Sequence, residues 1–142
     1  MKILSVFLII LALFIIVFPQ FTDCESQGRM LTLADGRQIP MKCHWTARAE
    51  VVVGLPLLVT SVLLLFSRHK ETRISLSILG VIFGVSAMLL PTYLIGVCGS
   101  VDMVCNSIMK PALLLSGGVV IVISLIIMIT SIARKETVTP VD

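Results

Sequence analysis

The chain has 142 residues, of which 57% are hydrophobic and only 13% are charged, and its net charge is +3. Because soluble domains carry roughly a quarter charged residues, this composition indicates one integral membrane domain over residues 1–142. The small and dispersed positive charge argues against nucleic-acid binding. The sequence contains no glycine-rich phosphate loop, HExxH or CxxC motif, so it favours a non-enzymatic protein without catalytic residues or cofactors.

Four apolar segments predict transmembrane helices at about residues 3–19, 46–66, 74–97 and 111–133. The first of them, with its charged start, also has the length of a cleaved signal peptide. No A-x-A cleavage site follows Pro19, so we expect an uncleaved first helix. The predicted fold class is therefore an all-α integral membrane protein, a four-transmembrane-helix bundle.

Two longer loops, residues 20–45 and 98–110, connect the predicted helices at one side of the membrane. Within the first loop, LTLADGRQIP alternates apolar and polar residues around the favoured turn dipeptide Asp35-Gly36. Pro40 then ends the second arm, since proline cannot donate to a strand ladder. The sequence thus predicts a small extracytoplasmic β-hairpin loop.

The distribution of basic residues predicts the orientation. Arg68, Lys70 and Arg73 crowd the short turn between the second and third helices, and Arg134 and Lys135 follow the fourth. Positively charged boundaries face the cytoplasm, so both termini are expected to be cytoplasmic in a multi-pass protein of the cell membrane. The two longer loops and all four cysteines then face the oxidising side, where disulfides persist.

Cys24, Cys43, Cys98 and Cys105 allow three disulfide connectivities. The local pairs Cys24–Cys43 and Cys98–Cys105 require the least rearrangement of the chain and are the expected ones. Crossed pairs that tie the first loop to the second are the alternative. The adjacent Cys43 and His44 match no standard zinc spacing, so we predict no metal site.

The segment MKCHWTARAE, residues 41–50, concentrates unusual side chains where the first loop enters the second helix. On a helix, Cys43, Ala47, Glu50 and Gly54 share one stripe, whereas Trp45 and Val52 point away from it. The candidate functional motif comprises His44, Trp45, Arg48 and Glu50. Two interpretations of Glu50 remain open: an interfacial charge near Arg48, or a functional acid inside the bundle.

Small residues predict where helices pack closely. Gly80 and Gly84 form a GxxxG face on the third helix, and residues 116–118 (Ser-Gly-Gly) narrow the fourth. Pro91 is expected to bend the third helix near its outer end, and Pro111 suits the first turn of the fourth.

The motifs MKCHWTARAE and PTYLIGVCGS, followed by a cysteine, Asn106 and a proline-initiated last helix, carry a resemblance to a known family. Over residues 24–132 the chain resembles the small prokaryotic membrane family known as domain of unknown function 4418. The resemblance implies a four-helix membrane protein and supplies no activity. Members accompany genes for ABC-type permeases, so it also implies a permease as a candidate partner.

Two functions from different classes fit these observations. The first is a disulfide-stapled membrane subunit that lies in the lipid bilayer and binds another membrane protein, such as an ABC-type permease, or a second copy of itself. The second is a membrane thiol–disulfide or quinone-linked redox protein. Its layout is similar to that of the disulfide-bond membrane oxidase family, but the chain lacks the CxxC motif that sets a redox pair.

Overall fold

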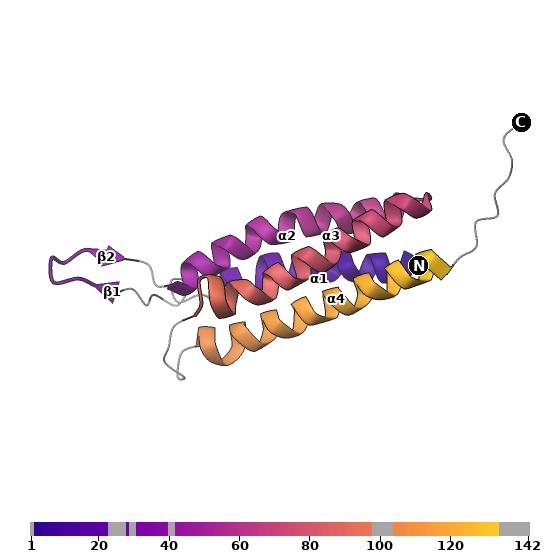
Figure 1. Ribbon diagram of the computed structural model, residues 1–142. Coiled ribbons are helices and arrows are strands. Elements are labelled where there is room, and N and C mark those ends of the chain that lie inside the picture. Colours follow the sequence, from indigo (N-terminus) through magenta and orange to yellow (C-terminus); the bar gives the residue numbers. More distant parts are fainter. Residues whose placement is uncertain (1, 23–27, 29–30, 40–41, 98–103, 134–142) are drawn as a thin grey trace, which may run out of the picture.

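The computed structural model describes residues 2–22, 28, 31–39, 42–97 and 104–133, and these residues form four long helices (Figure 1). The helices are α1 (Lys2–Thr22), α2 (Lys42–Phe66), α3 (Lys70–Leu89) and α4 (Lys110–Ala133). Each is long and apolar enough to cross a membrane, with α3 and α4 extended by the segments described below. The chain therefore has four helices of the length and composition expected of a multi-pass membrane protein.

Three helices are longer at the membrane boundary than the sequence indicates. α1 continues past Pro19 to Thr22, and α2 begins at Lys42, so residues 42–45 leave the predicted loop. The α2–α3 turn shrinks to residues 67–69 because α3 begins at Lys70 rather than at residue 74. At the edge of a bilayer the backbone has little water to bond, and a helix satisfies the backbone polar groups internally. Polar and proline residues at these positions therefore stay helical more readily than their helix propensities in water suggest.

The outer ends of α3 and α4 are wound as π-helices, which the sequence did not predict. They are η1 (Leu90–Leu94), which follows α3, and η2 (Cys105–Met109), which leads into α4 and takes residues 105–110 out of the predicted second loop. Pro91, where a bend was predicted, stands in the first turn of η1. The Leu90 carbonyl accepts the N–H groups of both Ile95 and Gly96, at 3.2 and 3.1 Å, and ends the helix.

Glycines bring α3 and α4 together, as the GxxxG pattern predicts. A Cβ at Gly84 would lie 3.1 Å from the carbonyl oxygen of Gly117, and a Cβ at Gly80 would lie 2.6 Å from Oγ of Ser124. Gly118, by contrast, faces open space. Only Gly117 of the predicted narrow waist therefore serves the α3–α4 contact.

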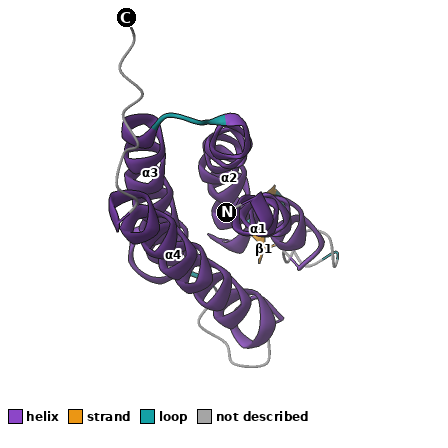
Figure 2. Cartoon of the chain, turned by 90° about the vertical axis from the view of Figure 1, so that its right-hand side faces the viewer, coloured by secondary structure: helices purple, strands orange, loops and turns teal. Residues whose placement is uncertain are grey.

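Neighbouring helices in the chain are also neighbours in space, in the order α1, α2, α3, α4 (Figure 2). The remaining pair, α1 and α4, has much the weakest contact of the four adjacent pairs. Each helix buries one stripe and exposes apolar residues elsewhere. Examples are Val52, Leu115 and Ile129, which are 60–72% exposed. An apolar exterior of this kind suits a bilayer and not water.

The predicted hairpin is present but very small. β1 (Leu31–Thr32) and β2 (Gln38–Ile39) pair antiparallel, with Leu31 opposite Ile39. Gly36 has φ of 78° and its N–H donates to the Leu33 carbonyl, so the turn is a three-residue loop that closes on a left-handed glycine. The hairpin stands away from the helices, beyond the end of the bundle where α2 begins (Figure 1).

Candidate functional site

The stripe predicted on α2 faces the inside of the bundle. Cys43, Ala47, Glu50 and Gly54 are all buried, and the first three are at most 1% exposed. Trp45 is 59% exposed and Val52 is 71% exposed, on the opposite side of the same helix. The i, i+4, i+7, i+11 spacing therefore identified the inward face correctly.

Glu50 lies inside the bundle, so the interpretation as an interfacial charge is wrong. Its side chain is 0% exposed, whereas Arg48, two residues earlier, is exposed on another side of α2. Neither carboxylate oxygen of Glu50 has a hydrogen-bond partner among the described residues. A buried acid in this state is costly inside a membrane, and such residues mark functional sites more often than structural ones.

Polar contacts around this stripe connect α2 to its neighbours. The Gln20 side-chain amide of α1 donates to the Ala47 carbonyl at 2.9 Å. The Thr46 hydroxyl, 0% exposed, donates to the Gly96 carbonyl beyond η1 at 2.7 Å. Neither Gln20 nor Thr46 was among the residues predicted from the sequence. Both are hydrogen-bonding side chains at the edge of an apolar segment, and that position in the sequence could have indicated a contact between helix ends.

The cysteines that the structure describes, Cys43 and Cys105, are buried at this outer end of the bundle. They are not joined to each other by a disulfide. The Cys105 thiol donates to the Thr22 carbonyl at the end of α1, at 3.3 Å. Cys24 and Cys98 lie outside the described residues, and so each predicted local pair has one member that the structure does not describe.

The rest of the candidate motif lies at the start of α2. His44 and Trp45 meet edge to face, with ring centroids 6.0 Å apart and planes at 82°. His44 is partly buried and Trp45 exposed, which suits an aromatic anchor at the membrane–water interface. The two rings therefore do not converge on Glu50, which lies further along the helix on its buried face.

A groove of about 450 Å³ runs between α1 and α4, where these two helices contact each other weakly. Its walls are almost wholly apolar, and they are formed by Ile10, Leu11, Phe14, Ala112, Leu115, Ser116 and Val119. Phe14 stacks on Phe18 along α1, with ring centroids 4.7 Å apart. On α4, Ala112 and Ser116 are small residues four positions apart, the spacing at which helices approach closely.

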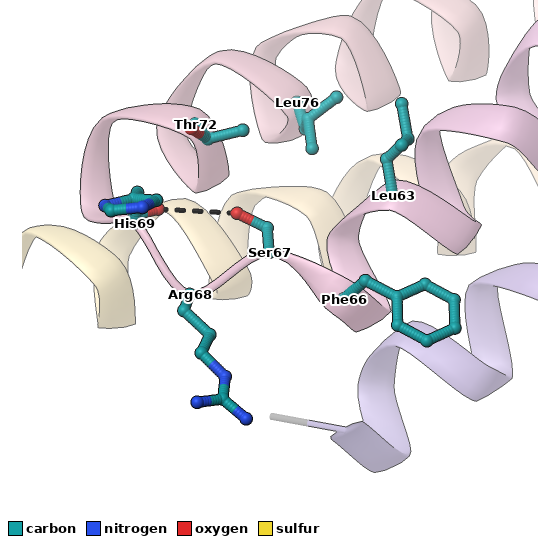
Figure 3. Close-up of a pocket in the computed structure, with 7 residues that line it drawn as sticks. All are labelled: Leu63, Phe66, Ser67, Arg68, His69, Thr72 and Leu76. Atoms are coloured by element: carbon teal, nitrogen blue, oxygen red, sulfur yellow. Dashed lines mark hydrogen bonds between the residues drawn. The ribbon is translucent and has the colours of Figure 1, made fainter.

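A second shallow pocket lies at the opposite end of the bundle, where α2 turns into α3 (Figure 3). It is lined by Leu63, Phe66, Ser67, Arg68, His69, Thr72 and Leu76. The Ser67 carbonyl accepts the Arg73 Nε–H at 3.0 Å, which helps to hold the tight turn. In Figure 3, Arg68 extends away from the pocket, so its charge does not converge with His69 on a common point.

The fold defines a small bundle of four apolar helices with a buried polar end, and the residues that the structure describes contain no assembled catalytic constellation. A family model described as "Domain of unknown function (DUF4418)" matches residues 3–130. The chain belongs to this family, which confirms the resemblance seen in the sequence. No curated protein and no solved structure matches the chain.

Proposed function

We propose that this protein is a disulfide-stapled membrane subunit that binds a transmembrane helix of another membrane protein, with an ABC-type permease as the candidate partner. The permease comes from the family resemblance. Both termini would be cytoplasmic and the hairpin end extracytoplasmic, as the basic turn between α2 and α3 indicates. The observation that carries the proposal is the apolar groove between α1 and α4.

The groove has the properties of an unfilled helix-packing face. Its walls come from two helices that elsewhere in the bundle pack against α2 and α3. Ala112 and Ser116 would allow a partner backbone to approach closely, while Ile10 and Phe14 offer a wide apolar side. Leu115, at the rim, is 72% exposed. In lipid, association depends on such close packing because lipid tails are as apolar as the helices.

Site-specific photo-crosslinking in cell membranes tests the docking proposal. A photoreactive residue at Leu115 should cross-link to a permease subunit, identified by mass spectrometry. The same residue at Val122, which is exposed on α4 but does not line the groove, serves as the control. Replacing Ala112 by Leu should fill the groove and abolish the cross-link. Adducts at Leu115 with lipid alone, or with a second copy of the chain, would contradict the proposal.

The disulfides that we propose are crossed ones, which join the first loop to the second. Two described contacts join the two outer segments of the chain: Cys105 to Thr22, and Thr46 to Gly96. Cys24 follows Thr22 by two positions, and Cys98 follows Gly96 by two. A chain of two residues reaches at most about 7 Å, so each contact keeps one cysteine of a crossed pair in the neighbourhood of the other. These contacts support Cys24–Cys105 and Cys43–Cys98 over the local pairs.

Each crossed disulfide forms when its two thiols pass two electrons and two protons to an extracytoplasmic thiol oxidant. Crossed pairing would close loops of roughly 55 and 80 residues, each contributing about 4 kcal/mol on the chain-entropy model. Mass spectrometry of non-reduced peptides should recover the 24–105 and 43–98 links. Recovery of 24–43 and 98–105 would restore the local pairing, and four alkylated thiols would remove the staple.

The redox alternative receives less support from the same residues. Cys43 and Cys105 are 0% and 1% exposed, and reactive cysteines sit where a partner thiol or a quinone can reach them. Thiol trapping in cells separates the two functions. A structural role predicts cysteines that stay oxidised under all growth conditions, whereas a trapped mixed disulfide would favour redox exchange.

A further inference from the structure

Glu50 is the one ionisable side chain that the structure describes as fully buried with no hydrogen-bond partner for either oxygen. It lies seven residues into α2 from Cys43, which corresponds to about 10 Å along the helix. At that depth water does not solvate it, and a bare carboxylate there would be strongly unfavourable. The acid must therefore carry a counter-charge: a proton or another small cation.

The helix facing Glu50 from one side is α1, at the level of a proline inside that helix. Gln20 contacts Ala47, one turn before Glu50, and a Cβ at Gly54, one turn after it, would overlap with Ile16. Glu50 is thus level with the last turns of α1, which contain the buried Pro19. Pro19 has no N–H to donate, so the carbonyl of residue 15 lacks its usual helical donor.

On the other side, Glu50 is level with the π-helical ends of α3 and α4. The Thr46 hydroxyl donates to the Gly96 carbonyl, so these two residues lie at the same depth. Glu50 lies one turn deeper on α2, which is the depth of η1 and its buried Pro91. The Cys105 thiol likewise donates to the Thr22 carbonyl, so Cys105 and Thr22 share a depth. About one turn deeper, Pro19 of α1 is therefore level with Met109 of η2. π-helical turns are frequent at functional sites, and discontinuous helices recur at membrane ion sites.

Few other charges surround this position. Between Lys2 and Thr22, α1 carries no ionisable residue, and α3 carries none between Arg73 and η1. The ionisable groups of the elements around Glu50 are Lys42 (exposed), Cys43, His44 and Arg48 on α2, Tyr93 on η1, Cys105 on η2 and Lys110 at the start of α4. Arg48 and Tyr93 are exposed, and Lys110 and His44 are partly so. No basic group that the structure describes is therefore buried beside the acid.

We propose that Glu50 is the anchor of an interior binding site for a small exchangeable cation, a proton or an alkali metal ion, at the level of Pro19 on α1 and of the π-helical segments η1 and η2. The carboxylate supplies the charge, and the carbonyl of residue 15, which lacks its helical donor because of Pro19, supplies a neutral ligand. This inference is independent of the groove between α1 and α4, because Glu50 is buried and no partner helix in that groove touches it.

Labelling with dicyclohexylcarbodiimide tests the proposal on the full-length protein in membranes. This apolar reagent adds to a protonated carboxyl group in an apolar setting and leaves a stable acylurea, which peptide mass spectrometry locates. We expect labelling at Glu50, and none at Glu71, which is exposed in the first turn of α3. Glu50→Gln should abolish the label, whereas Glu71→Gln should leave it unchanged.

Exchange is measured by the dependence of labelling on pH and on added salt. Between about pH 5 and about pH 9, the rate should fall, and once the acid titrates it should drop about tenfold for each further pH unit. Slowing by sodium, lithium or potassium at constant pH identifies an alkali metal ion, and no slowing identifies the proton alone. A Glu50 label that is insensitive to both pH and salt, or no label under any condition, would overturn the proposal.

Discussion

The contact between α3 and α4 yields a quantitative prediction for Gly84. A Cβ at this position would lie 3.1 Å from the Gly117 carbonyl oxygen and 2.8 Å from Cγ1 of Ile121. The Ile121 side chain can rotate, but the Gly117 oxygen is backbone and moves only if the helices separate. Overpacking of this kind costs about 1–3 kcal/mol. Alanine is also a better helix former than glycine by about 1 kcal/mol, which partly offsets that cost.

Gly118 provides the matched control on the opposing helix. A Cβ there meets nothing within 4 Å, so Gly118→Ala gains the helix preference without the clash. We therefore expect Gly84→Ala to be less stable than Gly118→Ala by about 1–3 kcal/mol. Unfolding by SDS in mixed micelles, followed through the single tryptophan, measures this difference. Equal stability of the two variants, or a more stable Gly84→Ala, would refute the close packing of α3 on α4.

Three further predictions concern the outer end and the orientation. Reporter fusions at Lys70 and Asp35 should report the cytoplasm and the outside respectively, and the same side for both would contradict the four-helix topology. Cys43→Ser and Cys105→Ser should lower the free energy of unfolding by similar amounts, because crossed loops have comparable closure entropies; local pairs would instead separate them by about 1 kcal/mol. Thr46→Val keeps the side-chain shape but loses the hydrogen bond to η1's end, so it should cost about 1 kcal/mol in the SDS assay, and an unchanged midpoint would show that this bond contributes nothing.

The overall class of the protein follows from the sequence alone, for a physical reason. A bilayer offers no hydrogen bonds, so long apolar segments can cross it only as helices. Composition and segment length therefore predicted four spans, and the i, i+4, i+7 spacing predicted that Cys43, Ala47 and Glu50 share a face. The GxxxG pattern at Gly80 and Gly84 predicted close packing in the same way, because only small residues permit it.

The surroundings of those faces depend on how separate helices meet, and local patterns carry no such information. Periodicity placed Glu50 on a stripe of α2 but could not show that other helices cover this stripe. The burial of Glu50 in the folded chain is what contradicts the interfacial interpretation. The sequence placed Pro19 at the end of the first helix and predicted a bend at Pro91. Their shared depth with Glu50 arises from contacts between residues far apart in the chain, such as Thr46 with Gly96 and Thr22 with Cys105. Those same contacts are the basis of the proposal that the cysteines pair between the two loops.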